Sequence, residues 1–551
     1  MRPVSRCACA KGGTEMANLD PALRAWRLLL GPARVLTSST DLAPYMASTA
    51  ASPVAPLAVL RPLSHGEVVA IVRSAGEFDI PLYPLSTGRN WGYGDANPSG
   101  AGQVILDLGG MNRILETDRE LAYAVIEPGV TQAQLAGHLA EQQLPLWMDC
   151  TGAGPDTSLV GNILERGFGH TPYGNRMLHV AGMRIVLASG DTLETGFAHF
   201  AHASAAYLYP YGVGPWLDGL FTQSNFGIVT SLGLWLMPQT EVVSHMVASV
   251  AGFGAIAAVV DALRPLRMDG TLSSVVHIGN DLRVLSGGMV FPAAQLPQGP
   301  PLPPQLRAEF CRQAGIGAWT VSAALYGRPA QVADARRTLR AAIGRLATLR
   351  FIDEKMLALG RLAGRWLGQG KLGTRISAQV NLGQSLLNMN RGIPDGRFLA
   401  GAYWRRRGGL PPEFPRGANP ARDGCGMMWL APVLPLRGRD LLHVHSLVEP
   451  LFATHGFDLF ETFSMVNERA LGGVLTICFD QEDAVETARA RLCYQAAFER
   501  LKGAGYIPYR VGPQSMKALD SGHDTYWGTV ARIKDALDPQ HIIAPGRYQP
   551  R

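Results

Sequence analysis

Apolar and polar positions along residues 60–145 alternate in a pattern that predicts helices and strands following one another. Ser64 and Glu67 have the spacing of a helix start, and the four β-branched residues of 68–72 supply its apolar content. A second helix start follows at Thr131 and Gln134. Between these helices a short apolar run stands at 81–85, and 104–108 predicts a buried strand. This order is typical of an α/β arrangement.

The pattern changes character after Gln239. Residues 245–500 contain longer helical patterns, with proline-rich stretches at 292–304 and 411–420. Proline lacks a backbone donor and cannot sit inside a hydrogen-bonded ladder, so both stretches are expected to be surface loops. The change marks a candidate domain boundary. No internal repeat or low-complexity tract is visible.

Both ends of the chain carry a specific expectation. Residues 483–502 predict an amphipathic helix. Its apolar face is predicted to consist of Val485, Ala488, Leu492 and Ala496. Helical patterning begins only after Met16, so residues 1–15 are expected to carry no fold and Met16 is an alternative start.

Composition narrows the class of protein. The 551 residues are 47% hydrophobic and only 17% charged, against ~25% in typical soluble domains, which favours a packed globular protein over a disordered one. The formal charge is only +6, and its densest cluster, Arg405–Arg407, is short enough to be a solvated surface, so we expect no nucleic-acid partner.

The cysteines and apolar runs bear on location. Seven scattered cysteines without zinc-type spacing predict no metal site and a reducing compartment, hence a cytoplasmic protein. No run reaches the ~20 apolar residues of a membrane span, since the longest, Met246 to Val260, is followed by Asp261. The N-terminus lacks the apolar region of a signal peptide.

Three glycine-rich segments are the candidate chemistry of the first half, at 86–94, 161–174 and 225–229. Glycine lets consecutive amides point into a concave nest that binds anions such as a pyrophosphate. The first segment matches neither a Walker loop nor the GxGxxG fingerprint followed by a helix. A tight turn explains one such segment equally well, but three within 145 residues suit a long cofactor laid across a domain.

Longer motifs give a specific resemblance. They read TGRNWGYG (87–94), VILDLGGMNRIL (104–115), EPGVT (127–131), VGNILERGFGHTPYG (160–174), DGLFTQSNFGIVTSLGLWLMP (218–238), YR (509–510) and DPQHIIAPGR (538–547). In this order, and from about residue 20 to the C-terminus, the chain resembles the vanillyl-alcohol oxidase / p-cresol methylhydroxylase family of FAD-dependent enzymes.

The resemblance implies an α+β protein of two domains. Residues 20–240, completed by 504–551, would form the FAD-binding domain, and 241–503 an α/β cap domain over the flavin. The motifs then imply the following FAD-binding residues: Gly88, Arg89, Asn90, Gly92, Pro128, Gly129, Gly161, Asn162, Gly169, His170, Tyr173, Gly174, Gly227, Ile228, Val229 and Arg547.

The resemblance also implies a substrate, a para-substituted phenol held by Tyr93, Tyr509 and Arg510. Removing a benzylic hydride is easier from a phenolate, because the ring oxygen then pushes electrons through to a p-quinone methide. A free phenol has a pKa of ~10, and a guanidinium with two tyrosyl donors would lower it. Water could then add to the quinone methide, or an alcohol could collapse to an aldehyde.

Two departures from the family stand out. Its carboxylate near the flavin falls on Gly152 or Ala153 here, so Asp156 becomes the candidate catalytic base and Asp149 a weaker one. The usual tether falls near Met427, which cannot bond to the flavin, so we expect non-covalent FAD. Cys425 is close but is more simply a buried small residue. His170 replaces an aromatic residue and is expected near the flavin or as a core histidine.

Several alternatives stay open. Oxygen or a cytochrome could reoxidise the flavin, and the resemblance suggests a homodimer. A wider relative of this fold would oxidise a 2-hydroxy acid or a sugar lactone instead. A third hypothesis is a flavin-binding protein that has lost its activity along with the carboxylate and the tether.

Overall fold

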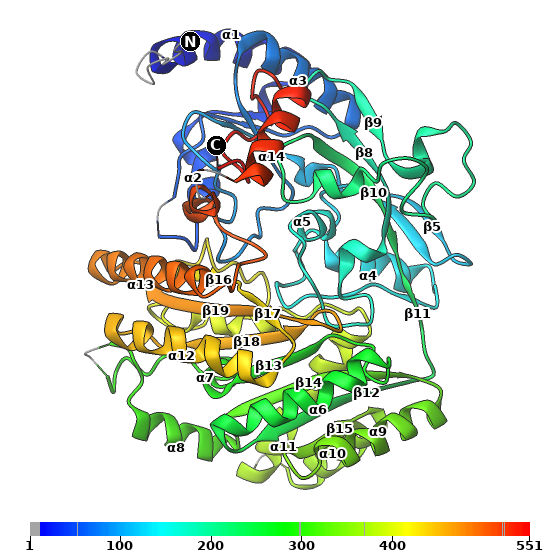
Figure 1. Ribbon diagram of the computed structural model, residues 1–551, viewed down its shortest axis with the longest axis vertical. Coiled ribbons are helices and arrows are strands. Elements are labelled where there is room, and N and C mark those ends of the chain that lie inside the picture. The colour runs from blue at the N-terminus through cyan, green and yellow to red at the C-terminus, as the bar shows by residue number, and fades with distance from the viewer. Residues whose placement is uncertain are drawn as a thin grey trace.

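The structure, a computed structural model, describes residues 11–51, 53–296, 299–368, 370–520, 522 and 524–550. Helices and sheets are mixed throughout, which confirms the predicted α+β class. Figure 1 shows two stacked parts: the upper one combines both ends of the chain, and the lower one is built from its middle.

The first sheet of the upper part has the strand order β1-β2-β4-β3, with β2, β4 and β3 parallel. Its strands are β1 (Val35–Leu36), β2 (Val59–Leu60), β3 (Leu82–Leu85) and β4 (Val104–Asp107). The helices beside it are α1 (Lys11–Leu30), α2 (Ser39–Met46) and α3 (His65–Phe78). The Ser64 side chain accepts a hydrogen bond from the Glu67 amide, so the predicted helix start is confirmed.

A second, antiparallel sheet has the order β5-β6-β10-β8-β9. Its strands are β5 (Ile114–Asp118), β6 (Tyr123–Ile126), β8 (Val180–Val186), β9 (Thr192–Glu194) and β10 (Ile228–Trp235). Helices α4 (Gln132–Glu141) and α5 (Leu159–Leu164) lie between its strands in sequence, and β7 (Leu146–Trp147) pairs with β11 (Met237–Pro238). Thr131 and Gln134 form the predicted capping box of α4.

The C-terminal segment returns to the first sheet. The Leu82 amide donates to the Ile542 carbonyl, and the Ala544 amide donates back to Leu82, both at 2.7 Å. Before this segment, α14 (Thr525–Leu537) presents Lys534, whose ammonium is fully buried and donates to the carbonyls of Asn225 and Ile543. Figure 1 accordingly shows the red C-terminal helix beside the blue α3.

The lower part is built on one antiparallel sheet with the order β15-β12-β14-β13-β18-β19-β16, and β17 also pairs with β19. Its strands are β12 (Val242–Val250), β13 (Val276–Asn280), β14 (Trp319–Gly327), β15 (Thr348–Ile352), β16 (Cys425–Leu430), β17 (Val433–Pro435), β18 (Phe460–Met465) and β19 (Ala470–Asp480). This sheet falls within the predicted range 241–503; the boundaries of that range stay a prediction.

Helices cover the outer face of this sheet and form the largest core with it. The helices that pack there are α6 (Ile256–Met268), α9 (Pro329–Ile343), α12 (Gly438–His455) and α13 (Ala484–Gly503). Around them lie α7 (Asp281–Leu285), α8 (Pro304–Ala314), α10 (Glu354–Trp366) and α11 (Lys371–Asn390). In Figure 1, α12 and α13 run along β18 and β19.

Two expectations about local structure were wrong. The helix at 483–502 exists as α13, but Val485 and Leu492 are 73% and 58% exposed. Its buried face instead consists of Glu486, Ala490, Cys493, Tyr494, Ala497, Phe498 and Leu501, because the large aromatics outweigh the small apolar stripe. Helix α1 begins at Lys11, so residues 11–15 are helical; residues 1–10 lie outside the described range.

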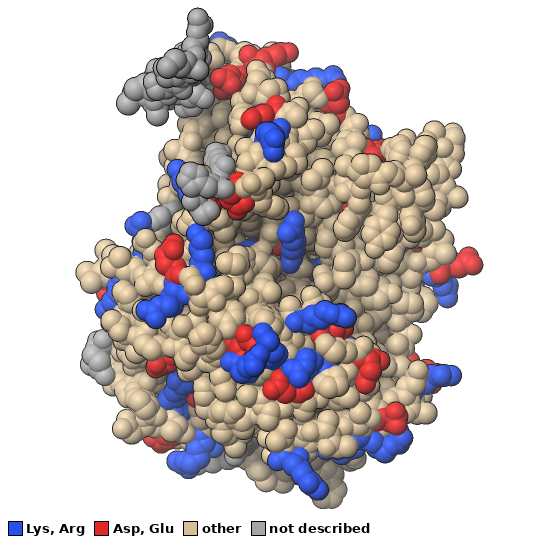
Figure 2. Space-filling view, in the orientation of Figure 1, with Lys and Arg blue, Asp and Glu red and all other residues tan. Residues whose placement is uncertain are grey.

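The surface shows no single-sign field on the face of Figure 2, where basic and acidic side chains are interspersed. The predicted basic cluster is engaged within the fold: Arg405 pairs with Glu486 at 2.7 Å and Arg407 with Asp480 at 2.6 Å. Across the described residues no helix is both long and apolar enough to cross a membrane. The same residues contain no cluster of three metal-ligating side chains.

Candidate functional site

A cavity of about 350 Å³ lies between the two parts of the molecule. Strand alternation in the lower sheet creates one wall of it, because successive side chains point to opposite faces. On β18, Phe463 and Met465 enter the core under the helices, whereas Thr462 and Ser464 line the cavity. The same alternation places the following side chains at the cavity: His277, Met427, Trp429, Val474, Thr476 and Cys478.

The opposite wall is made by the glycine-rich loops of the upper part. Gly88 has a φ of +65°, which glycine adopts without strain. A Cβ at Gly161 would lie 2.9 Å from the Ser86 hydroxyl oxygen, so the chain approaches here as only glycine allows. Ser158 ties the loops together, accepting from the Gly161 amide and donating to the Pro128 carbonyl.

The charges of the cavity fit an anionic cofactor such as FAD. Among the described residues that line it, the basic ones are Arg89, Arg283, Arg510 and Arg547, and the acidic ones only Asp95 and Glu165. The Nη1 atom of Arg89 is buried without a hydrogen-bond partner in the described structure. A pyrophosphate against these loops would supply acceptors to their amides and to that guanidinium.

The cavity sorts the predicted FAD-binding residues into two groups. Those that line it are Gly88, Arg89, Asn90, Pro128, Gly161, Asn162, His170, Gly227, Ile228, Val229 and Arg547. Those that do not are Gly92, Gly129, Gly169, Tyr173 and Gly174. The second group builds the loops instead of facing the cavity. A Cβ at Gly169 would collide with the Asp149 carboxylate, and Tyr173 stacks on His179 with ring centroids 4.0 Å apart.

Tyr93, Tyr509 and Arg510 meet at one end of the cavity, although the two tyrosines lie 416 positions apart in the sequence. The Arg510 guanidinium carbon lies 4.5 Å from the centre of the Tyr93 ring. The Tyr93 hydroxyl is buried beside the Tyr509 hydroxyl, whose pKa it lowers as a hydrogen-bond donor. Burial raises the pKa of both tyrosines, although the charge of Arg510 opposes that rise. Both hydroxyls therefore stay protonated and able to donate.

The backbone around this group is held from several sides. The Tyr509 amide donates to Ala431 at 3.0 Å, and the Gln223 side chain donates to the Tyr509 carbonyl at 2.8 Å. Tyr93 packs edge-on against Trp429 of β16, with ring centroids 5.4 Å apart. Segments from both parts of the molecule thus fix this end of the cavity.

Glu165 is a site residue that was not predicted from the sequence, although it lies within the motif at 160–174. Its carboxylate pairs with Arg547, lies 3.3 Å from Arg510 Nε and accepts from the Tyr548 hydroxyl at 2.9 Å. One buried carboxylate therefore orients two of the four arginines that line the cavity. The Arg510 guanidinium also donates to the side chain of Asn90.

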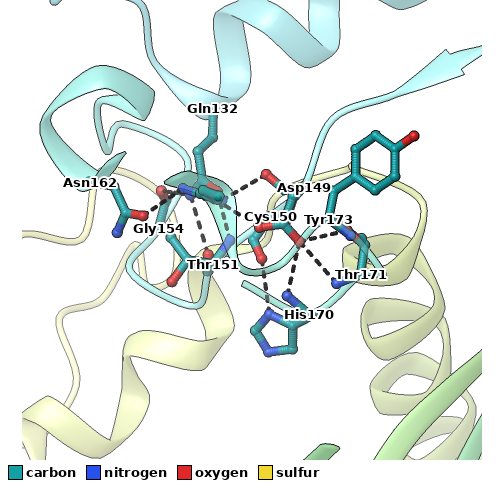
Figure 3. A network of polar contacts seen from close by, with 10 residues as sticks. Gln132, Asp149, Cys150, Thr151, Gly154, Asn162, His170, Thr171 and Tyr173 are labelled. Atoms are coloured by element: carbon teal, nitrogen blue, oxygen red, sulfur yellow. Dashed lines mark hydrogen bonds and ion pairs between the residues drawn. The ribbon is translucent and has the colours of Figure 1, made fainter. Parts of the chain in front are cut away.

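Asp156 was predicted as the catalytic base, and the structure places it elsewhere. Its side chain is 56% exposed, pairs with Arg89 at 3.7 Å and does not line the cavity. Asp149, the weaker candidate, is locked in a structural network (Figure 3). It accepts from Arg176 at 2.7 Å and from the amides of His170 and Thr171. Neither carboxylate is among the residues that line the cavity.

Two buried histidines, His170 and His277, line the cavity. His170 lines the cavity and donates from Nδ1 to the Cys150 carbonyl at 3.0 Å, since a carbonyl can only accept, which leaves Nε2 as the acceptor (Figure 3). Its ring centre lies 4.5 Å from that of His277. Burial lowers the pKa of both, and lowers that of the adjacent His245 to about 3. All three are neutral imidazoles at neutral pH.

The predicted tether position also lies at the cavity. Met427 lines it from β16, as its motif implied. Cys425, two residues earlier on the same face of the strand, is buried with Trp91 and Tyr403 and does not line the cavity. Burial raises the pKa of its thiol, which keeps the sulfur protonated and unreactive.

The sequence and the fold are similar to those of known flavoproteins. A family described as "FAD binding domain" matches residues 56–196. The chain is 37% identical to the 1'-carboxy-chondrochloren decarboxylase of Chondromyces crocatus, over 96% of this chain and 97% of the relative. It is 31% identical to the 4-cresol dehydrogenase [hydroxylating] flavoprotein subunit of Pseudomonas putida, over 97% and 96%. The crystal structure of p-cresol methylhydroxylase with substrate bound superposes with a TM-score of 0.85, at 30% identity and 97% coverage of both chains.

Fold, cavity and relatives together define an FAD-dependent oxidoreductase. The chain belongs to the p-cresol methylhydroxylase family, because the similarity extends over nearly the full length of both sequences. This confirms the resemblance seen in the motifs, and with it FAD as the cofactor.

Proposed function

We propose that this enzyme oxidises the para side chain of a phenol, a 4-alkylphenol or a 4-hydroxybenzyl alcohol, through a p-quinone methide. The observation that carries the proposal is the convergence of Tyr93, Tyr509 and Arg510 at one end of the cavity. FAD, when bound, supplies a two-electron acceptor for the benzylic hydride.

The three side chains are suited to hold a phenolate. The Arg510 cation favours the ionised form of a phenol, and the protonated hydroxyls of Tyr93 and Tyr509 can donate to its oxygen. Because the pKa of each tyrosine is raised, neither competes with the substrate for ionisation. Glu165 holds Arg510 in place, and its ion pairs keep it from acting as a base itself.

His170 is the group we propose as proton acceptor in place of the absent carboxylate. Its Nε2 carries a lone pair because Nδ1 is committed to Cys150, and burial keeps the ring unprotonated. In a hydroxylating reaction it would take a proton from the water that adds to the quinone methide.

A second candidate reaction is oxidative loss of CO2 from a carboxylated phenol. It is supported by the named activity of the 37% identical relative and by the engagement of both acidic residues in the described lining, which leaves no free carboxylate as a base. Asp95 accepts from Ser48 and Thr49, and Glu165 is ion-paired, so both are already engaged. A decarboxylation needs no base to activate water.

Several finer properties also belong to the proposal. FAD would be non-covalent, because a thioether stands at Met427; unfolding in acid should then release all of the flavin into the supernatant. The acceptor would be oxygen or a cytochrome, and the assembly a homodimer. A cytoplasmic location is supported by the five described cysteines, all of which are free and buried.

The test is anaerobic mixing of the FAD-loaded protein with 4-ethylphenol and 4-hydroxybenzyl alcohol. We expect both phenols to bleach the flavin. The methyl ether of 4-ethylphenol, which cannot ionise, should leave the flavin oxidised. Bleaching by lactate or a sugar lactone but by no phenol would replace the proposal with the 2-hydroxy-acid or lactone alternative. If none of these bleaches the flavin, the protein is an inactive homologue.

A further inference from the structure

Arg283 lies at the other end of the cavity, on the cap side. It belongs to α7, which begins directly after β13, and its amide donates to the Asn280 side chain at 2.9 Å. The guanidinium is partly buried and lines the cavity. A Cβ added at Gly401 would lie 3.1 Å from Arg283 Nη1 and 3.0 Å from the Ser286 hydroxyl oxygen. Both side chains therefore border the Gly401 backbone, and the Ser286 hydroxyl donates to the Arg283 carbonyl at 3.0 Å.

Arg283 has no partner for its charge. Within the described residues its guanidinium makes no hydrogen bond or ion pair. Its neighbours in the fold differ: Arg307 pairs with Asp281, and Arg405 with Glu486. Withdrawing an unpaired cation from water costs free energy, so a partner that completes it is expected to come from outside the chain.

Among the described residues that line the cavity, no other charged side chain accompanies Arg283 at this end. Burial keeps His170 and His277 neutral, and the Arg283 charge itself adds to that lowering of their pKa values. The Cys478 thiol, which acts on the pKa of Arg283, is itself neutral, because burial and then the Asp458 charge raise its pKa to about 12. Within the described lining, an anion bound here would therefore meet the positive charge of Arg283.

This end is distinct from the phenolate end. Trp429 of β16 packs on Tyr93, whereas the Arg283 guanidinium lies beside Gly401 and acts on the Cys478 thiol of β19. Rings connect the ends: Tyr509 to Phe168 at 5.9 Å, Phe168 to His277 at 6.4 Å, and His277 to His170 at 4.5 Å.

We propose that Arg283 binds the carboxylate of a phenolic acid whose phenol lies against Tyr93, Tyr509 and Arg510. A planar guanidinium matches a carboxylate with two parallel hydrogen bonds. The inference rests on the proposed function, which it deepens by assigning the substrate an anionic side chain. It also names the residue that selects that side chain.

The position of the carboxylate decides the product. When it sits one carbon beyond the benzylic carbon, removal of the benzylic hydride to the flavin leaves a quinone methide beside a C–COO⁻ bond. That bond breaks, CO2 leaves, and its electron pair forms the new C=C bond while the ring returns to phenolate. Arg283 orients the carboxylate and takes no proton in this step.

The test compares an acid with its uncharged amide in holoenzyme variants. Binding of 3-(4-hydroxyphenyl)propanoate and of 3-(4-hydroxyphenyl)propanamide would be measured by calorimetric titration. We expect Arg283→Met to weaken binding of the acid about 30- to 150-fold, the loss of charge-assisted hydrogen bonds, and binding of the amide less than about twofold. Arg283→Lys should recover part of the acid affinity, and it preserves the charge if Arg283→Met fails to fold.

The controls separate the ways in which the inference can fail. Arg336→Met removes a cap guanidinium that pairs with Asp353 away from the cavity, and it should change neither affinity. Equal weakening of acid and amide by Arg283→Met, or none, would overturn the role of Arg283. If wild type binds 4-ethylphenol and is bleached by it but binds the acid no tighter than the amide, this inference fails alone. If no phenol binds, the proposed function fails with it.

Discussion

The two ends of the cavity each present an arginine, and the two are held in opposite ways. Arg510 is paired with Glu165 and donates to Asn90, so its position is fixed before any ligand arrives. Arg283 is fixed only through its backbone, and its guanidinium is unpaired within the described residues. Arg510 is therefore a preorganised group that acts on the developing charge of the ring. Arg283 instead gains its partner only when a negatively charged substrate binds.

The residues around the two arginines differ in the same way. Near Arg510 the neighbours are tyrosines that can donate to an oxyanion, and a carboxylate balances the cation. Near Arg283 the neighbours are neutral histidines and a protonated thiol, so the cation is unbalanced. A substrate with negative charge at both ends would satisfy this arrangement, whereas a neutral alkylphenol would satisfy only half of it.

The largest effect should come from Arg510→Met. Loss of the cation that stabilises the phenolate should slow flavin reduction by 4-ethylphenol about 10²- to 10³-fold, the usual effect of removing a preorganised oxyanion donor. Stopped-flow absorbance measures it. The preference for acid over amide should persist in this variant, because Arg283 is intact. Its disappearance would show that the two arginines do not act separately.

A smaller effect is expected when Arg283 is given an internal partner. Ser286→Asp places a carboxylate beside the guanidinium, so a substrate acid should bind about 10- to 50-fold more weakly while the amide is unaffected. Ser286→Ala is the matched control and should cost the acid only a few-fold. Titration of both ligands into both variants checks this; unchanged acid binding in Ser286→Asp would contradict it.

Glu165→Gln should affect the phenolate end indirectly, since Glu165 is a positioning residue. Arg510 would keep its charge but lose its fixed orientation, so flavin reduction by 4-ethylphenol should slow about tenfold. The phenol concentration for half-maximal reduction should become more dependent on pH, a change that mere destabilisation would not produce. Glu354→Gln, at an exposed pair with Arg391, serves as the control and should leave rate and pH profile unchanged.

The smallest expected effect concerns pH. The pKa values of His170 and His277 are lowered by burial, so these rings stay neutral above their usual value of 6.5 and for some distance below it. The acid should therefore bind with the same Kd, within about twofold, from pH 8 to 6.5, because only Arg283 supplies charge. Marked tightening as the pH falls through that window would show that a histidine takes up a proton and shares the anion.

The sequence allowed the cofactor wall to be predicted better than the substrate wall. Long motifs locate the glycine loops, and most residues assigned to FAD from them do line the cavity. The exceptions, such as Gly129 and Gly169, are required by close backbone packing, which a motif does not distinguish from ligand contact. Tyr93, Tyr509 and Arg510 converge as expected, although their shared role remains a proposal.

The cap wall could not be predicted for a physical reason. Alternation along β18 or β19 divides residues into two faces, but both faces carry apolar side chains, and only the fold shows which one the helices cover. Arg283 follows a strand with no motif around it. Asp156 was misplaced because proximity in sequence to the family's carboxylate position does not ensure the same direction of the side chain. The face of α13 was wrong for a related reason, since small residues at helical spacing were outweighed by Tyr494 and Phe498.

The central claim, a phenol oxidiser that recognises an anionic side chain, is tested most directly in the wild-type protein by one comparison. The limiting rate and half-saturating concentration of anaerobic flavin reduction would be measured for 3-(4-hydroxyphenyl)propanoate and for its amide. We expect both to reduce the flavin, and the acid to reach half-saturation at a concentration at least about 30-fold lower. Equal half-saturation, or reduction by the amide alone, would contradict the account.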